Sequence, residues 1–140
     1  MVFKKTSVYE NLSGKEQEHY NYTIIANTLK DYNIICLPLS LDDDGPDFVA
    51  HNNRTRENIN VQQKGRFHIA SRYEGKKLWI VFVKDGSVYL YNHDEVVNHM
   101  KNTKHIHKLE TKSYVSEGWH TQNITAWMSE MIEDGLIKKL

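Results

Sequence analysis

The sequence predicts an α/β domain in which a mixed central β-sheet is flanked by helices, with a further helix at the C-terminus. Two observations carry this prediction. Apolar residues recur every three or four positions near both ends of the chain, which is the period of a helix. Short apolar or alternating runs, bounded by turn residues, fill the middle of the chain as strands do. A helix, four or five strands and then further helices is the element order of an α/β or α+β domain with a mixed sheet.

The first helix is predicted over residues 14–32. Ser13 has the character of an N-cap, and Glu16 three residues later completes a capping box. The apolar and aromatic stripe of this helix consists of Tyr22, Ile25, Leu29 and Tyr32. Extended one turn towards the N-terminus, the same stripe includes Glu18, so we expect Glu18 on the packed side of the helix. Asn33 is suited to end the helix in the left-handed conformation.

The middle of the chain is predicted to form the sheet. The expected strands are Ile34–Leu39, Asp47–His51, Ile59–Phe67, Leu78–Val83 and Val88–Tyr91. Pro38 favours an edge position for the first strand, and the continuous apolar run of the fourth favours a central one. Asp85-Gly86 predicts a tight hairpin turn. The acidic run Asp42–Asp44 is interpreted as a solvated turn, with a ligand for a second metal ion as the alternative.

The C-terminal part is predicted to be mainly helical. Asn92 caps an expected helix at His93–Lys101, and a short strand is expected at Lys112–Val115. Thr121 is expected to cap the last helix, which Gly135 ends.

Length and composition indicate one domain over residues 1–140, with a core at about 13–100 and a helical tail at about 101–140. Eighteen basic side chains balance eighteen acidic ones, which excludes a strongly basic surface over the whole protein. No run approaches the ~20 apolar residues of a membrane helix, so we expect no membrane partner. A single cysteine, Cys36, and the lack of a signal-like N-terminus predict a cytoplasmic location.

Candidate site residues gather on two neighbouring strands. In the run from Ile59 onwards, Val61 takes one face, and Gln62 and Lys64 share the other, because side chains alternate along a strand. Asp47 begins the preceding strand of the same hairpin, so its carboxylate is expected near Gln62 and Lys64. Glu18 on the first helix is expected to reach the same place. Hard oxygen ligands beside a lysine suit Mg²⁺-assisted phosphodiester hydrolysis.

The blocks Gly45-Pro46-Asp47-Phe48-Val49-Ala50 and Val61-Gln62-Gln63-Lys64-Gly65-Arg66 resemble the two core strands of the PD-(D/E)xK nuclease superfamily. That superfamily includes restriction endonucleases and archaeal Holliday-junction resolvases, and the resemblance covers roughly residues 13–100. It implies a restriction-endonuclease-like fold, Mg²⁺ or Mn²⁺ as cofactor, and metal-dependent cleavage of DNA. By position it implies metal ligands at Asp47, Gln62 and Glu18, and a catalytic lysine at Lys64.

The sequence departs from the family pattern at Gln62, where a carboxylate is usual. An amide oxygen binds Mg²⁺ without adding charge. The alternative function is therefore a catalytically inactive module of the same fold that binds nucleic acid or a protein. Each site residue also has a structural interpretation: Asp47 as a turn residue, Lys64 as an edge-strand lysine, and Gln62 and Glu18 as solvated side chains.

Basic residues near the predicted site suggest a nucleic-acid partner, DNA rather than RNA. Arg54 and Arg56 precede the Gln62–Lys64 segment, and Arg66 and Arg72 follow it. We expect them to contact phosphates beside the bond that is cut, with a solvated rim as the alternative. A homodimer is expected, because cutting both strands of a duplex commonly uses two sites related by two-fold symmetry.

Overall fold

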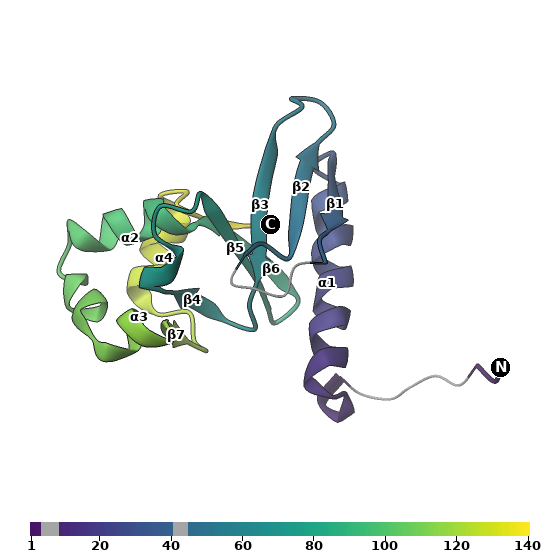
Figure 1. Ribbon diagram of the computed structural model, residues 1–140, viewed down its shortest axis with the longest axis horizontal. Helices are drawn as coiled ribbons and strands as arrows, with labels where there is room; N and C mark the ends of the chain where they lie inside the picture. Colours follow the sequence, from purple (N-terminus) through teal and green to yellow (C-terminus); the bar gives the residue numbers. More distant parts are fainter. Residues whose placement is uncertain (4–8, 41–44) are drawn as a thin grey trace.

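A computed structural model describes residues 1–3, 9–40 and 45–140 (Figure 1). The acidic run Asp42–Asp44 lies outside the described residues. The helices are η1 (Tyr9–Asn11), α1 (Gly14–Lys30), η2 (Ser71–Tyr73), α2 (His93–Lys101), η3 (Ile106–Glu110), α3 (Lys112–Ser116) and α4 (Ala126–Glu133). None of these described helices has both the length and the apolar character needed to cross a bilayer.

The strands form one large and one small sheet. They are β1 (Ile34–Pro38), β2 (Phe48–Asn52), β3 (Asn58–Gln63), β4 (Phe67–Ile69), β5 (Leu78–Lys84), β6 (Ser87–Asn92), β7 (Trp119–Thr121) and β8 (Ile137–Lys139). The large sheet has the order β1-β2-β3-β5-β6-β8, and β4 pairs with β7. Among the described strands, only β3 and β5 pair in parallel, so the sheet is mixed and the predicted α/β class is confirmed.

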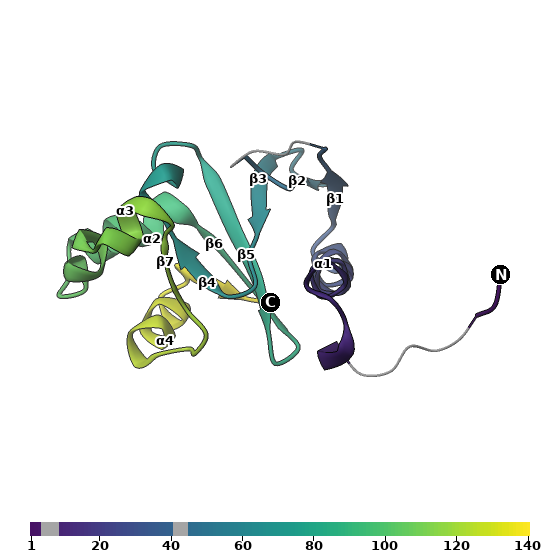
Figure 2. The ribbon, with the colours of Figure 1, turned by 60° about the horizontal axis from the view of Figure 1, so that its bottom comes forward.

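Helix α1 covers one face of the large sheet. Its N-terminus is the predicted capping box, in which Ser13 Oγ accepts from the Glu16 backbone N–H and Glu16 Oε1 accepts from the Ser13 backbone N–H. Ile25 and Leu29 are buried against the sheet. The sheet residues of this core are Phe48, Ala50, Val61, Val81, Val88 and Leu90. Figure 2 shows α1 apart from the other α-helices, which lie together beyond β5 and β6.

The opposite face of β5 and β6 carries the second core. It is rich in aromatic side chains, and Tyr91 is central to it because its ring stacks on Phe67 at 5.1 Å between centroids. The Tyr91 hydroxyl donates to the His68 carbonyl and accepts from the His68 backbone N–H. Helices α2 and α4 close this core with Val96, Val97, Met100, Met128 and Met131. The crossover between β3 and β5 is thereby fixed to the sheet.

Three predicted elements differ from the structure. The strand expected at Ile59–Phe67 is two strands, because β3 ends at Gln63 and β4 belongs to the other sheet. The strand expected at Lys112–Val115 is the helix α3, whose first turn is capped by Thr111 Oγ1 accepting from the backbone of Tyr114. The last helix begins at Ala126 rather than just after Thr121, and β8 follows it as a short strand paired with β6.

Candidate functional site

Asp47 sits in the sheet one residue before β2. Its backbone N–H donates to the Val61 carbonyl at 2.8 Å, and its carbonyl accepts from Leu39 at 2.9 Å. Its carboxylate Oδ2 accepts from the backbone N–H of Gln63 at 2.8 Å. The other carboxylate oxygen forms no hydrogen bond with the residues that the structure describes. The Asp47 carboxylate is therefore held at the end of β3 with one oxygen available to a ligand.

The alternation predicted for β3 is present, and Gln62 lies on the face away from α1. Val61 belongs to the core under α1, whereas Gln62 pairs in register with Ile80 of the opposite core. Gln62 is only 8% exposed, because the crossover to β5 covers this face. The interpretation of Gln62 as a solvated strand residue is wrong. Its Oε1 is buried without a hydrogen-bond partner among the described residues, which is costly unless a ligand occupies the place.

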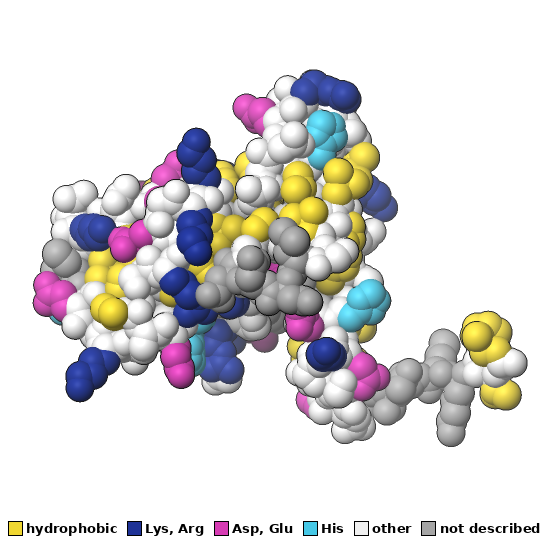
Figure 3. All heavy atoms as spheres, in the orientation of Figure 1, with side chains coloured by type: hydrophobic (Ala, Val, Ile, Leu, Met, Phe, Trp, Pro, Cys, Tyr) yellow, Lys and Arg dark blue, Asp and Glu magenta, His cyan; other side chains and the backbone are white. Residues whose placement is uncertain are grey.

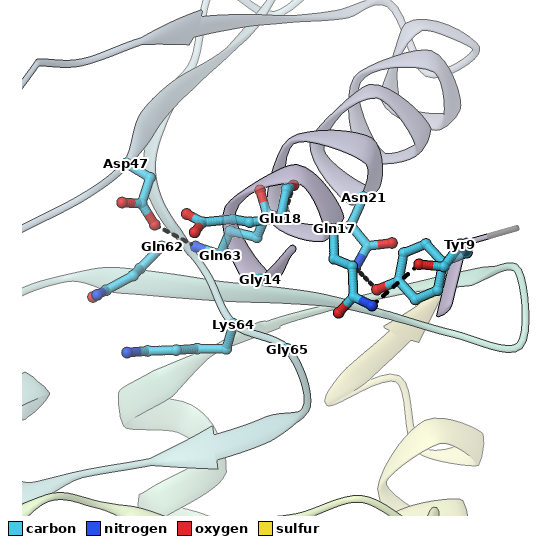
Figure 4. A pocket seen from close by; sticks show the side chains of 10 residues that line it. All are labelled: Tyr9, Gly14, Gln17, Glu18, Asn21, Asp47, Gln62, Gln63, Lys64 and Gly65. Atoms are coloured by element: carbon cyan, nitrogen blue, oxygen red, sulfur yellow. Dashed lines mark hydrogen bonds between the residues drawn. The ribbon is translucent and has the colours of Figure 1, made fainter. Parts of the chain in front are cut away.

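Lys64 follows β3 and continues its pairing with β5. Its backbone N–H donates to the Val81 carbonyl at 2.9 Å. The ammonium lies 5.4 Å from the centroid of the Tyr73 ring, a contact that steadies the long side chain. Figure 4 shows the side chains of Gln62 and Lys64 extending to the same side of the chain.

Glu18 reaches the same region from α1. Its carbonyl accepts from Gln63 Nε2 at 2.8 Å, which ties the end of β3 to the helix. The side chain extends towards Asp47 in Figure 4. Glu18 is expected on the packed side of the helix, but its side chain is exposed, as its interpretation as a solvated side chain has it. Glu18 does follow the stripe of Ile25, but α1 extends past the ends of the strands here, so the stripe opens onto a pocket instead of a core (Figure 1).

These groups border one open pocket of about 410 Å³ (Figure 4). The lining comprises Tyr9, Gly14, Gln17, Glu18, Asn21, Asp47, Gln62, Gln63, Lys64 and Gly65. Gln17 and Asn21 did not emerge from the sequence, although their helical spacing from Gly14 and Glu18 places them on the same face. Asn21 Nδ2 donates to the Tyr9 hydroxyl at 3.0 Å, so both groups are held at the rim.

Most polar groups that line the pocket carry oxygen atoms of the kind that coordinate metal ions. Asp47 and Glu18 contribute two carboxylates, and Gln62 contributes the buried amide oxygen. Hard oxygen donors of this kind suit Mg²⁺, which is usually bound by one or two carboxylates and keeps several waters. Within residues 1–3, 9–40 and 45–140 there is no cluster of three or more His, Cys, Asp or Glu arranged for a metal ion. Gln62 is one of the amide side chains that add oxygen atoms to the two carboxylates of the described lining.

The predicted phosphate-binding arginines do not gather at the pocket. Arg54 and Arg56 lie in the exposed turn between β2 and β3, at the opposite end of the hairpin from Asp47 and Lys64. Figure 3 shows basic side chains at this tip. A strand of five residues separates the two ends by roughly 17 Å.

Arg72 and Arg66 differ in their surroundings. Arg72 donates to the Glu117 carbonyl at 2.7 Å and to the Tyr73 hydroxyl at 3.0 Å, so it links the crossover to the segment after α3. Arg72 is half-buried, and its guanidinium is engaged in these hydrogen bonds. Arg66 lies two residues beyond Lys64 and borders a neighbouring polar pocket.

No known protein family, curated protein or solved structure matches the chain.

Proposed function

We propose that the protein is a metal-dependent endonuclease-like hydrolase of DNA phosphodiester bonds, built on a restriction-endonuclease-like core. One observation carries the proposal: Asp47, Gln62, Lys64 and Glu18 come from three elements and border a single pocket. The unpartnered Oε1 of Gln62 supports it, because a buried carbonyl oxygen without a donor is suited to a cation.

Asp47, Gln62 and Glu18 would hold a divalent cation, Mg²⁺ or Mn²⁺. When bound there, the cation supplies Lewis-acid stabilisation of charge on the phosphoryl oxygens. Lys64 orients the attacking water and stabilises the negative charge that develops during the attack. The Tyr73 ring beneath its ammonium and the backbone bond to Val81 limit the positions that this group samples.

The proposed substrate is DNA in preference to RNA. Phosphodiester cleavage of both strands of a duplex needs two sites, and we propose a homodimer as their source. Sedimentation at tens of micromolar protein tests the dimer separately, since a strict monomer is still able to nick one strand.

A specific observation favours a second candidate, a noncatalytic module of the same fold that binds nucleic acid or a protein. The described lining of the pocket contributes two carboxylates, and Gln62 adds no charge to a metal site. A site with this charge has a lower affinity for Mg²⁺ than one with three carboxylates. The two candidates differ in a single measurement, which is metal-dependent bond cleavage.

The test is nicking of supercoiled plasmid and cleavage of linear, branched and single-stranded DNA, with Mg²⁺, Mn²⁺ or EDTA. We expect wild-type protein to cut only with a metal ion and Lys64→Ala to cut at least about 100-fold more slowly, the scale of losing one transition-state donor. Lys112→Ala is the matched control, because Lys112 is exposed on α3 and does not line the pocket.

Two results would overturn the nuclease proposal. One is a wild-type protein that is inert on every DNA with both metal ions. The other is Lys64→Ala cutting at the wild-type rate, because the cleavage then does not use the proposed site. DNA binding retained in the first case favours the noncatalytic module.

A further inference from the structure

A second polar pocket adjoins the candidate site where the chain leaves β3. It has a volume of about 390 Å³ and lies between the bend that precedes β4, the end of β5 and the loop that precedes α4. Arg66, Lys84, Gln122 and Asn123 contribute polar side chains to it. The pocket therefore combines groups that are distant in sequence into one concave polar surface.

The charges of this pocket favour an anion. Arg66 and Lys84 are half-buried, and neither side chain forms a hydrogen bond or ion pair with any described residue. The described lining holds two cations against one carboxylate, that of Asp85. Gln122 and Asn123 add amide N–H donors. A guanidinium and an ammonium with unused donors are the groups that bind phosphate.

Gly65 connects the two pockets, because it lines both of them. It is exposed and has no side chain, so nothing projects from this residue between the candidate site and the second pocket. Lys64 and Arg66 flank it, and two residues of chain span at most about 7 Å. Successive phosphates of one nucleic-acid strand are separated by a similar distance.

We propose that the pocket of Arg66 and Lys84 binds the phosphate next to the scissile one, with the strand passing over Gly65. This inference rests on the proposed function, because it takes the first pocket as the place of the scissile phosphate. It specifies the ligand as a strand with at least two consecutive phosphodiesters. The phosphate contacts supply affinity without sequence preference.

The first test measures binding of a fluorescent 12-nucleotide DNA in EDTA, where cleavage is absent, over a range of salt concentrations. The double variant Arg66→Ala/Lys84→Ala is expected to bind the DNA about tenfold more weakly than wild type. The slope of the logarithm of its binding constant against the logarithm of the salt concentration should be smaller in magnitude by about one. Lys30→Ala/Lys112→Ala is the control. It removes the same charge from two exposed helix positions that line neither pocket.

The second test enlarges Gly65. A Cβ at this position meets no atom within 4 Å, and its φ lies outside the left-handed region, so a side chain fits the fold. Gly65→Ala is expected to bind DNA as wild type does. Gly65→Leu places a large side chain between the two pockets. It is expected to bind the DNA about tenfold more weakly than wild type, while the thermal unfolding midpoint stays unchanged.

The outcomes separate this inference from the proposed function. If the Arg66/Lys84 variant binds with the wild-type affinity and salt slope, or if no DNA binds at low salt, the second phosphate site is wrong. Inorganic phosphate that displaces the oligonucleotide when both are at the same concentration also overturns it, since the pocket would then be a binding site for a free anion. The nuclease proposal is judged independently by metal-dependent cleavage in wild type and Lys64→Ala.

Discussion

Asp47 and Gln63 are joined by a hydrogen bond of 2.8 Å from the backbone N–H of Gln63 to Oδ2 of Asp47. The donor is at the last residue of β3, and the acceptor immediately precedes β2. The orientation of the carboxylate is thus set by the sheet backbone as well as by its own rotamer. The Gln63 side chain also donates to the backbone carbonyl of Glu18, so one residue links the Asp47 carboxylate to the backbone of α1.

Replacing Asp47 by Asn separates the charge from the hydrogen bond. The amide oxygen of Asn still accepts from Gln63, so the unfolding midpoint should change by less than about 2 °C, since a surface polar swap is usually within about 0.5 kcal/mol. Cleavage should fall at least about 100-fold, because the lost metal interaction is worth several kcal/mol. Cleavage assays and thermal denaturation measure the two effects.

Asp47→Ala is the companion variant. It removes the acceptor of the Gln63 N–H as well and should cost about 1 kcal/mol of unfolding free energy in urea. An Asp47→Asn protein with wild-type cleavage would contradict the assignment of Asp47 as a metal ligand.

Gly118 is predicted to be the glycine least tolerant of substitution. Its φ is +109°, and an added Cβ would collide with the His68 imidazole and lie 2.9 Å from the Ile69 carbonyl. Gly118→Ala should destabilise the protein by about 3 kcal/mol, combining backbone strain with the collision. Gly135→Ala is the control, because φ is +78° with open space around the Cβ, and should cost about 1 kcal/mol. Equal losses in chemical denaturation would show that the contact with His68 does not matter.

His68 should make the folded state sensitive to mild acid. Burial lowers the pKa of His68 to about 4, with smaller contributions from Lys64, Arg72 and His120 nearby. Between pH 6.5 and about 4 the unfolded chain binds a proton at this residue and the folded chain does not, so the free energy of unfolding decreases as the pH falls. Above pH 6.5 the residue has no such effect.

The measurement is the thermal midpoint of wild type and His68→Gln from pH 7.5 to 4. The variant should lose less stability over the acidic part of this range. Parallel curves would assign the acid sensitivity to other groups, such as His93, whose pKa is also lowered by burial.

Local signals explain what could be predicted from the sequence. The capping pair Ser13 and Glu16 begins α1, Asn33 has a φ of +62° after it, and Asn92 caps α2 through its side chain. Each of these depends on residues within one turn. The alternation that places Gln62 and Val61 on opposite faces is equally local.

Long-range contacts explain what could not be predicted. Strands β4, β7 and β8 have three residues each, too short for a periodic signal, and exist only through their partners. The burial of Gln62 depends on the crossover packed over its face. Arg72 is held by carbonyls about 45 residues further along the chain, which no spacing in the sequence indicates.

Gln62→Met tests whether the buried amide is retained for function. Methionine has a similar shape and removes the unpartnered Oε1, so the free energy of unfolding should rise by about 1 kcal/mol, the lower range of the cost of an unsatisfied buried group. Metal-dependent cleavage should be lost at the same time. A Gln62→Met protein that is less stable in urea would mean that the amide has a structural partner.

Gln62→Glu tests the metal site from the opposite direction. In EDTA the new carboxylate is buried near Asp47, so the thermal midpoint should lie below that of wild type. Mg²⁺ that binds the folded state stabilises it by RT ln(1 + c/Kd), where c is the concentration of free Mg²⁺, and the added charge should lower Kd and so make the rise in the thermal midpoint larger than in wild type. Cleavage should be kept or raised, because the described lining of the pocket has two other carboxylates and the gain in metal binding outweighs repulsion of the phosphate. A titration of Mg²⁺ followed by thermal denaturation and by plasmid nicking measures both. If Mg²⁺ shifts neither readout in Gln62→Glu or in wild type, Gln62 is not a metal ligand and the noncatalytic module is the better description of the protein.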